Sequence, residues 1–197
     1  MNPFDPVRVT AAILAGGAGS RLHGRDKGLQ PLAGKPLIAH VAAALRSQAG
    51  AVLICINRNA SEYAAYGATC FDGVAGYRGP LAGIAAALHV CTTGWLLTVP
   101  VDCPRPPIDL ARRLHAAVAH GARAAVAHDG GRRQPLFALY ARDCATQAAD
   151  ALSRDLPVWR WQDELGGVEV DFADASAAFT NLNSDAEFHA WETSHDG

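Results

Sequence analysis

One stretch near the amino end limits most strongly what this chain can fold into and bind. The apolar run Val9 to Leu14 is typical of a buried strand, and the four residues that follow it, 15–18, are all small. Glycine lacks a Cβ, so the backbone there can turn sharply and approach a ligand closely. Three cations come next, Arg21, Arg25 and Lys27. Because exposed N–H groups and positive side chains share one loop, we expect it to bind the phosphates of a nucleotide.

Two common phosphate-binding loops do not fit this stretch. A P-loop has a hydroxyl residue directly after its lysine, whereas Lys27 is followed by Gly28. The dinucleotide pattern G-x-G-x-x-G fits Gly17 and Gly19 but places Leu22 where the third glycine belongs. The sequence therefore indicates neither a P-loop enzyme nor a dehydrogenase.

The composition excludes several other classes of protein. Half of the 197 residues are hydrophobic, which suffices for one core, and we expect a single domain over residues 1–197. The net charge of −2 gives no basic field for nucleic acid. Five cysteines, an odd number without a C-x-x-C pair, argue against a complete disulfide framework. With no signal sequence and no long apolar span, we expect a cytoplasmic protein that binds neither nucleic acid nor membrane.

Apolar runs and helical spacings alternate along the chain. Strands are expected at 9–14, 51–56, 68–71, 95–99, 122–128, 135–140 and 167–172, with helices at 36–49, 81–90, 109–120 and 143–152. Ser184 and Glu187 have the spacing of a capping box for a last helix. The alternation predicts an α/β fold, a three-layer α/β/α sandwich with a mostly parallel, Rossmann-like sheet and one antiparallel strand late in the chain.

Trp159 and Trp161 are two residues apart in a less regular region. Such a pair could stack on a planar ligand ring, but this spacing is more typical of one half-buried face of a strand. We therefore expect the two rings to share a strand face.

A carboxylate, Asp102, follows the expected strand 95–99 and lies between Pro100 and Pro104. A hard cation such as Mg²⁺ prefers one or two carboxylates with phosphate oxygens and water, so Asp102 is the best candidate metal ligand. Taken without the first loop, a loop or helix-capping aspartate would be the favoured interpretation. No motif places a histidine near Cys103, and we expect that thiol to be inert.

Several motifs of the chain occur together, in the same order, in one known family. The first loop of molybdenum cofactor guanylyltransferases resembles Leu14-Ala15-Gly16-Gly17, Ser20-Arg21-Leu22, Asp26-Lys27-Gly28 and Gly34-Lys35-Pro36-Leu37. The resemblance continues over nearly the whole chain in Gly79-Pro80-Leu81-Ala82-Gly83, Pro100-Val101-Asp102-Cys103-Pro104 and Asn181-Leu182-Asn183. It implies a nucleotidyltransferase fold and the transfer of GMP from GTP to the molybdopterin-bound molybdenum cofactor, with release of pyrophosphate.

The resemblance also implies roles for individual residues. Arg21 and Lys27 would neutralise the triphosphate, and Asp102 would hold Mg²⁺ against the α-phosphate. Asn181 and Asn183 would lie beside the metal aspartate and the acceptor. The residues implied at the nucleotide are Leu14, Ala15, Gly16, Gly17, Cys55, Asn57, Asp72 and Gly83.

The chain departs from the family at two positions. Cys55 stands where an asparagine is frequent, so that amide's role is either lost or transferred to Asn57. Gln134 stands where a histidine usually precedes the proline that matches Pro135, and the role of that histidine is open here.

Two alternative functions remain at this point. Cytidylyl relatives usually carry Leu-Ala-Ala-Gly, and although Gly16 favours a purine, a cytidylyltransferase acting on the same cofactor or on a sugar phosphate is the runner-up. The other alternative is a nucleotide-binding module that carries cofactor without transfer activity. The expected partners are GTP and the molybdenum cofactor, together with molybdenum-insertion and molybdoenzyme proteins.

Overall fold

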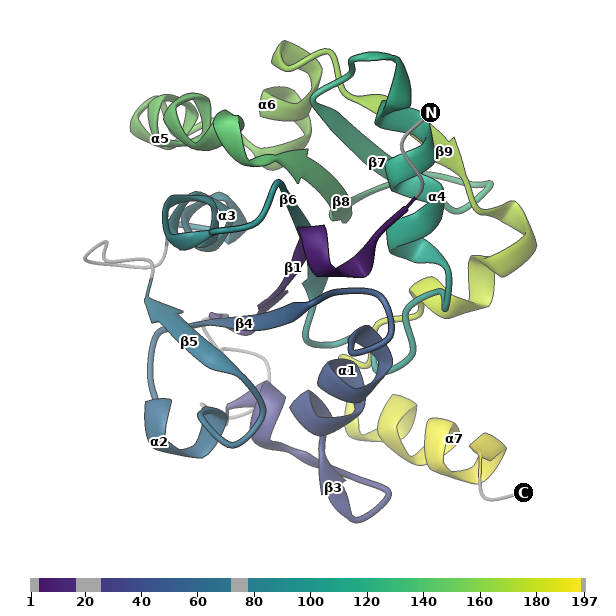
Figure 1. Cartoon of the computed structure of the whole chain (residues 1–197). Helices are drawn as coiled ribbons and strands as arrows, with labels where there is room; N and C mark the ends of the chain where they lie inside the picture. The colour runs from purple at the N-terminus through teal and green to yellow at the C-terminus, as the bar shows by residue number, and fades with distance from the viewer. Residues whose placement is uncertain (1–3, 17–25, 72–77, 196–197) are drawn as a thin grey trace.

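The computed structural model describes residues 4–16, 26–71 and 78–195, whose course Figure 1 shows. They form a seven-stranded sheet in the order β5-β4-β1-β6-β8-β7-β9 and a two-stranded sheet, β2-β3. The strands are β1 Val9–Leu14, β2 Pro31–Leu32, β3 Lys35–Pro36, β4 Ala51–Ile56, β5 Ala68–Phe71, β6 Trp95–Pro100, β7 Ala124–His128, β8 Arg133–Ala141 and β9 Val168–Asp171.

The helices connect and cover these strands. The α-helices are α1 Leu37–Leu45, α2 Ala60–Tyr63, α3 Pro80–Val90, α4 Leu110–Ala117, α5 Ala145–Ser153, α6 Val158–Glu164 and α7 Asp185–His195. The 3-10 helices are η1 Pro6–Arg8, η2 Lys27–Leu29, η3 Val118–His120, η4 Arg142–Cys144 and η5 Ala173–Phe179. None of the helices in the described ranges combines the length and apolar character that crossing a membrane requires.

The large sheet is mostly parallel, as the alternating pattern indicates. β5, β4, β1 and β6 pair in parallel, as do β7 and β9. β8 is antiparallel to both β6 and β7, which confirms the antiparallel strand expected late in the chain. Because β1 lies between β4 and β6, the carboxyl ends of three parallel strands meet at one edge, where α/β sheets bind their ligands.

The three-layer arrangement is confirmed by two hydrophobic clusters, one on each face of the sheet. Successive strand residues point to opposite faces, so Ala11 and Ile13 of β1 pack with α1 and α4, whereas Ala12 packs with α3, α5 and Trp161. Figure 1 shows α3 and α5 on one side of the sheet and α1 and α4 on the other. The fold is thus an α/β/α sandwich.

The carboxyl-terminal helix α7 closes a third, smaller cluster formed by Leu32, Leu37, Leu182 and Phe188. The capping box expected at its start is present. The Ser184 hydroxyl accepts a hydrogen bond from the Glu187 backbone N–H at 3.3 Å, and the Glu187 carboxylate accepts one from the Ser184 N–H at 2.8 Å.

Two expected elements differ in the structure. The helix expected at 36–49 is shorter, because Pro36 pairs with Pro31 in the two-stranded sheet and serves as the N-cap of α1. The last turn expected for this helix is absent. There the Gln48 side chain donates a hydrogen bond to the Pro107 carbonyl and accepts one from the Ala111 N–H. Gln48 therefore fastens the end of α1 to the start of α4.

The expectation that Trp159 and Trp161 share a strand face is wrong, because both lie in helix α6, which begins after Pro157. Trp161 is 1% exposed and stacks on Tyr140 with ring centroids 4.8 Å apart, whereas Trp159 is half exposed. Residues two apart on a helix point roughly 200° from each other, so only one ring of the pair reaches the core.

Candidate active site

A cation, a carboxylate and an amide meet at the carboxyl edge of the sheet. The Lys27 ammonium donates hydrogen bonds to Asp102 Oδ2 at 3.0 Å and to Asn183 Oδ1 at 2.7 Å. The side chains of Lys27 and Asp102 are each 20% exposed, so the ion pair is shielded from solvent but can still be reached. Three sequence-predicted site residues from distant parts of the chain are thus brought together.

Backbone contacts hold Asp102 at this place. It follows β6, and the Val101 N–H donates to the Leu14 carbonyl at 3.2 Å, which continues the pairing of β6 with β1. The Leu182 N–H donates to the Asp102 carbonyl at 2.8 Å. Asn181 and Asn183 flank Leu182, so this hydrogen bond holds the segment that carries both amides against Asp102.

Two oxygens of this cluster are suited to a hard cation. Asp102 Oδ1 and Asn181 Oδ1 are buried and have no hydrogen-bond partner among the described residues. Buried oxygens without a donor are costly unless a ligand compensates them, and oxygens are the ligands that Mg²⁺ prefers. Within the described ranges no three His, Cys, Asp or Glu residues gather as a metal cluster. The residues therefore fit Mg²⁺ that completes its coordination with phosphate oxygens and water.

The loop that the sequence predicts to bind phosphates begins next to this cluster, at the ends of β1 and β4. The Ala15 N–H donates to the Cys55 carbonyl at 2.9 Å, which extends the parallel pairing past Leu14. The exposed Asn57 amide donates to the Gly16 carbonyl at 2.9 Å. A Cβ on Gly16 would lie only 3.2 Å from the Asn57 side-chain oxygen, so glycine is what lets the amide approach the loop.

Cys55 and Gly83 lie beneath this loop, between β4 and α3, where the helix packs against the sheet. The Cys55 side chain is 2% exposed, and its thiol donates to the Gly83 carbonyl at 3.4 Å. A Cβ on Gly83 would be in ordinary contact with both Cys55 and Leu14. Cys55 is therefore buried beneath the loop, while the Asn57 amide contacts the loop backbone at Gly16.

Three of the expected site residues, Gly17, Arg21 and Asp72, lie outside the described residues. Local contacts account for two further residues of the sequence analysis, Cys103 and Gln134. Burial, helped by the negative charge of Asp102, raises the pKa of the Cys103 thiol to about 12, so it is not a nucleophile at neutral pH. The Gln134 amide donates to the Asp129 carboxylate at 2.5 Å and thereby supports the turn before β8.

Sequence reasoning missed a second carboxylate in the site. Asp26, directly before Lys27, accepts hydrogen bonds from the Tyr63 hydroxyl at 2.5 Å and the Asn59 amide at 2.9 Å. The Asp-Lys-Gly motif signals that Asp26 matters, but no local pattern points to Tyr63.

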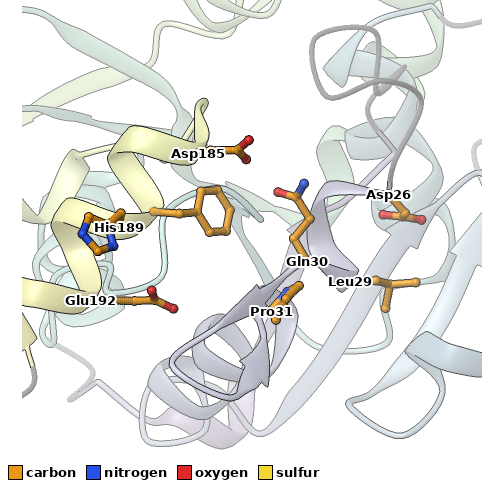
Figure 2. Close-up of a pocket in the computed structure, with 8 residues that line it drawn as sticks. Asp26, Leu29, Gln30, Pro31, Asp185, His189 and Glu192 are labelled. Atoms are coloured by element: carbon orange, nitrogen blue, oxygen red, sulfur yellow. The ribbon is translucent and has the colours of Figure 1, made fainter.

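A pocket of about 510 Å³ opens between the η2–β2 segment and α7, as Figure 2 shows. Its lining is mixed, with carboxylates and a histidine beside apolar side chains: Asp26, Leu29, Gln30, Pro31, Asp185, Phe188, His189 and Glu192. Carboxylates repel phosphate groups, so this side of Lys27 does not suit a triphosphate.

Comparison with known proteins places these features in one family. Residues 11–168 match the model of the MobA-like NTP transferase domain. A molybdenum cofactor guanylyltransferase from Cupriavidus metallidurans is 43% identical over 195 residues, covering 94% of this chain and 95% of that protein. One from Photobacterium profundum is 40% identical over 176 residues, covering 89% and 91% respectively.

Solved structures show the same fold. Molybdopterin-guanine dinucleotide biosynthesis protein A from Archaeoglobus fulgidus is similar with a TM-score of 0.76 at 23% identity, covering 93% of this chain and 97% of that one. A 2-C-methyl-D-erythritol 4-phosphate cytidylyltransferase from Thermus thermophilus has a TM-score of 0.69 at 18% identity, covering 96% and 98%. At these identities the likeness concerns the fold alone.

Proposed function

We propose that this chain, which belongs to the MobA-like NTP transferase family and is a nucleotidyltransferase, transfers GMP from GTP to the terminal phosphate of molybdenum-bearing molybdopterin. The products are the guanine dinucleotide form of the cofactor and pyrophosphate. The observation that carries the proposal is the contact of Lys27 with both Asp102 and Asn183, in a chain whose guanylyltransferase relatives match nearly its full length.

The proposed reaction needs no general base. An oxygen of the acceptor phosphate, already anionic at neutral pH, attacks the α-phosphorus of GTP and forms a new P–O bond. The bond from the α-phosphorus to the oxygen bridging to the β-phosphate breaks, and pyrophosphate leaves with that electron pair. What the protein contributes is positioning and the neutralisation of charge.

In this proposal the backbone of Leu14 to Gly17 holds the base and phosphates, with Asn57 supporting the loop through Gly16. Arg21 and Lys27 neutralise the triphosphate. Lys27 can do so because its ammonium is anchored to Asp102 and Asn183 and is preorganised before the substrate arrives. We assign Asp72 to the nucleotide as well, from the resemblance of its segment to the family.

Asp102 and Asn181 would hold Mg²⁺ through the two buried oxygens that lack donors, with Asn183 beside them. The bound ion would neutralise charge on the phosphate oxygens at the reacting end of the nucleotide. Asp102 shares its other oxygen with Lys27, so the carboxylate sets the spacing between the two positive charges.

The test is pyrophosphate release from GTP and from CTP, each with and without molybdopterin, alongside calorimetric binding of both nucleotides. Release that requires both GTP and molybdopterin is expected. Release with CTP in preference to GTP would replace the proposal by a cytidylyltransferase. Tight GTP binding without any release in the presence of acceptor would indicate a cofactor carrier instead.

A further inference from the structure

The Asp26 carboxylate, although adjacent to Lys27, is turned away from the reaction centre. Its side chain is 10% exposed and does not cap its own turn, the 3-10 helix η2. It is directed instead toward the segment after β4, where Oδ2 accepts from the Asn59 amide at 2.9 Å and lies 3.6 Å from Arg58 Nε. In Figure 2, Asp26 lies on the side of the pocket away from α7. A negative charge beside Lys27 is thus neutralised by other donors.

Tyr63 occupies the second oxygen of this carboxylate. It is the last residue of α2, its side chain is fully buried, and its hydroxyl donates to Asp26 Oδ1 at 2.5 Å. Burial, together with the hydrogen bond to the negative Asp26, raises the pKa of this hydroxyl above its ordinary value. The hydroxyl therefore stays protonated and remains a donor.

The same hydroxyl also fits against Gly28, on the other side of Lys27. A Cβ at position 28 would lie 2.3 Å from the Tyr63 oxygen, closer than any real contact. Tyr63 thus touches the residues before and after Lys27 at once. Because Asp26 and Gly28 are both fixed against one buried ring, the backbone direction at Lys27 is fixed as well.

The hydrogen bonds within the turn that carries Lys27 are few. η2 has three residues, and its backbone hydrogen bonds, from Leu29 to Asp26 and from Gln30 to Lys27, are both 3.2 Å long. Short 3-10 turns are weak on their own, so the outside contact is decisive for the lysine's position. Asn59, with the left-handed φ of 58°, starts α2 and brings its donor to Asp26.

We propose that Tyr63 and Asp26 are positioning residues that fix η2 so that the Lys27 ammonium meets Asp102 and Asn183. This inference rests on the catalytic role proposed for Lys27. Neither residue is a base or a metal ligand in this scheme, since both carboxylate oxygens of Asp26 already accept hydrogen bonds. The hydrogen bonds of Tyr63 and Asn59 to Asp26 connect the segment after β4 to the turn that carries Lys27. The position of the lysine therefore depends on that segment.

The experiment compares Tyr63→Phe with wild type in GMP transfer, with rates expressed per folded enzyme after a urea titration of each protein. Loss of the hydroxyl is expected to lower kcat roughly 10- to 100-fold, the range for a displaced catalytic group. Tyr66→Phe is the matched control, because Tyr66 lies three residues on and packs against the same cluster as Tyr63. It should retain the wild-type kcat.

The decisive comparison repeats Tyr63→Phe in a Lys27→Ala background. If the hydroxyl acts through Lys27, removing it should lower kcat by less than about 2-fold once the lysine is gone, because the effects of coupled residues are not additive. An equal loss in both backgrounds, or an undiminished kcat in Tyr63→Phe, would overturn the inference while leaving the proposed function intact. A wild-type enzyme that transfers no GMP would overturn both.

Discussion

Lys27 and Asp102, 75 positions apart in the chain, form an ion pair of 3.0 Å at the carboxyl edge of the sheet. The Asn183 amide oxygen accepts from the same ammonium at 2.7 Å, so two side chains fix the position of the lysine. In the proposed reaction the same ammonium would turn part of its hydrogen bonding to the phosphates, while Asp102 would hold the metal ion.

Lys27→Ala should lower GMP transfer by roughly one to three orders of magnitude, because a preorganised charge contact is lost. The measurement is kcat/KM for pyrophosphate release at saturating Mg²⁺. Lys35→Ala removes an equal charge from an exposed position of β3 and is expected to be neutral. Wild-type turnover in Lys27→Ala would contradict the role given to this residue.

Asp102→Asn keeps the shape of the side chain but removes its charge. We expect turnover to fall at least about 100-fold and the Mg²⁺ concentration for half-maximal activity to rise, because a carboxylate ligand is replaced by an amide. Asp143→Asn is the matched control, since that side chain is 76% exposed and distant in the fold, on η4. An unchanged Mg²⁺ requirement in Asp102→Asn would rule out Asp102 as the metal ligand.

Gly16→Ala should weaken GTP binding roughly 10-fold, because the added Cβ pushes the Asn57 amide away from the loop. Stability should hardly change, since Asn57 is exposed and can swing outward. Calorimetry with GTP and CTP measures the effect. In an Asn57→Ala background, Gly16→Ala should hardly change the affinity for GTP. An undiminished 10-fold loss of affinity there would show that Gly16 acts on the nucleotide without Asn57.

Gly28→Ala tests the contact with Tyr63 through stability. A Cβ 2.3 Å from the buried hydroxyl must displace it, at a cost of about 1–3 kcal/mol for overpacking. Urea unfolding provides the measurement. Gly131→Ala is the control, because its nearest neighbour would be an ordinary contact at 3.5 Å, and it should shift the free energy of unfolding by less than about 0.5 kcal/mol. Equal stability of the two variants would show that Tyr63 is loosely held.

The turn before β8 should contribute to stability in a pH-dependent way. Backbone N–H groups of Arg132 and Gly131, with the Gln134 amide, lower the pKa of Asp129 from 3.8 to about 2. Since the folded pKa lies below the unfolded one, the stabilisation is present above pH 3.8 and is lost as the pH falls toward 2. Asp129→Asn should flatten the pH dependence of unfolding in that window, and NMR titration of the carboxyl gives the pKa directly.

The scaffold was predictable because its signals are local. β1, β4 and β5 have the bounds that their apolar runs predict, and the capping box marks the start of α7 within one residue. These patterns depend on neighbours along the chain, and burial of both sheet faces enforces them. The fold class follows from the alternation of such segments.

The errors arose where one local pattern fits two structures. Two tryptophans two residues apart suit one face of a strand, but the same spacing also fits a helix that turns one ring inward and the other outward, as it does here. The β2-β3 hairpin was not foreseen, since Ala33 and Gly34 both adopt positive φ there and Ala33 is not a residue expected to do so.

Some residues of the site could be predicted from the sequence and others could not. The motifs named Lys27, Asp102 and Asn183, and the structure brings them into contact. Tyr63 carries no motif, because its importance comes from the closeness of α2 to η2, which only the folded chain reveals. Long-range contacts of this kind leave no periodic trace in a sequence.

The hydrogen bond from Leu182 to Asp102 has a consequence for biosynthesis. Residues 181–183 leave the ribosome only after every strand of the large sheet has been made. Domains begin to fold while synthesis continues, so an emerging polypeptide can assemble its scaffold with an ammonium and a carboxylate already paired, yet without either asparagine. The two asparagines would then join the site last.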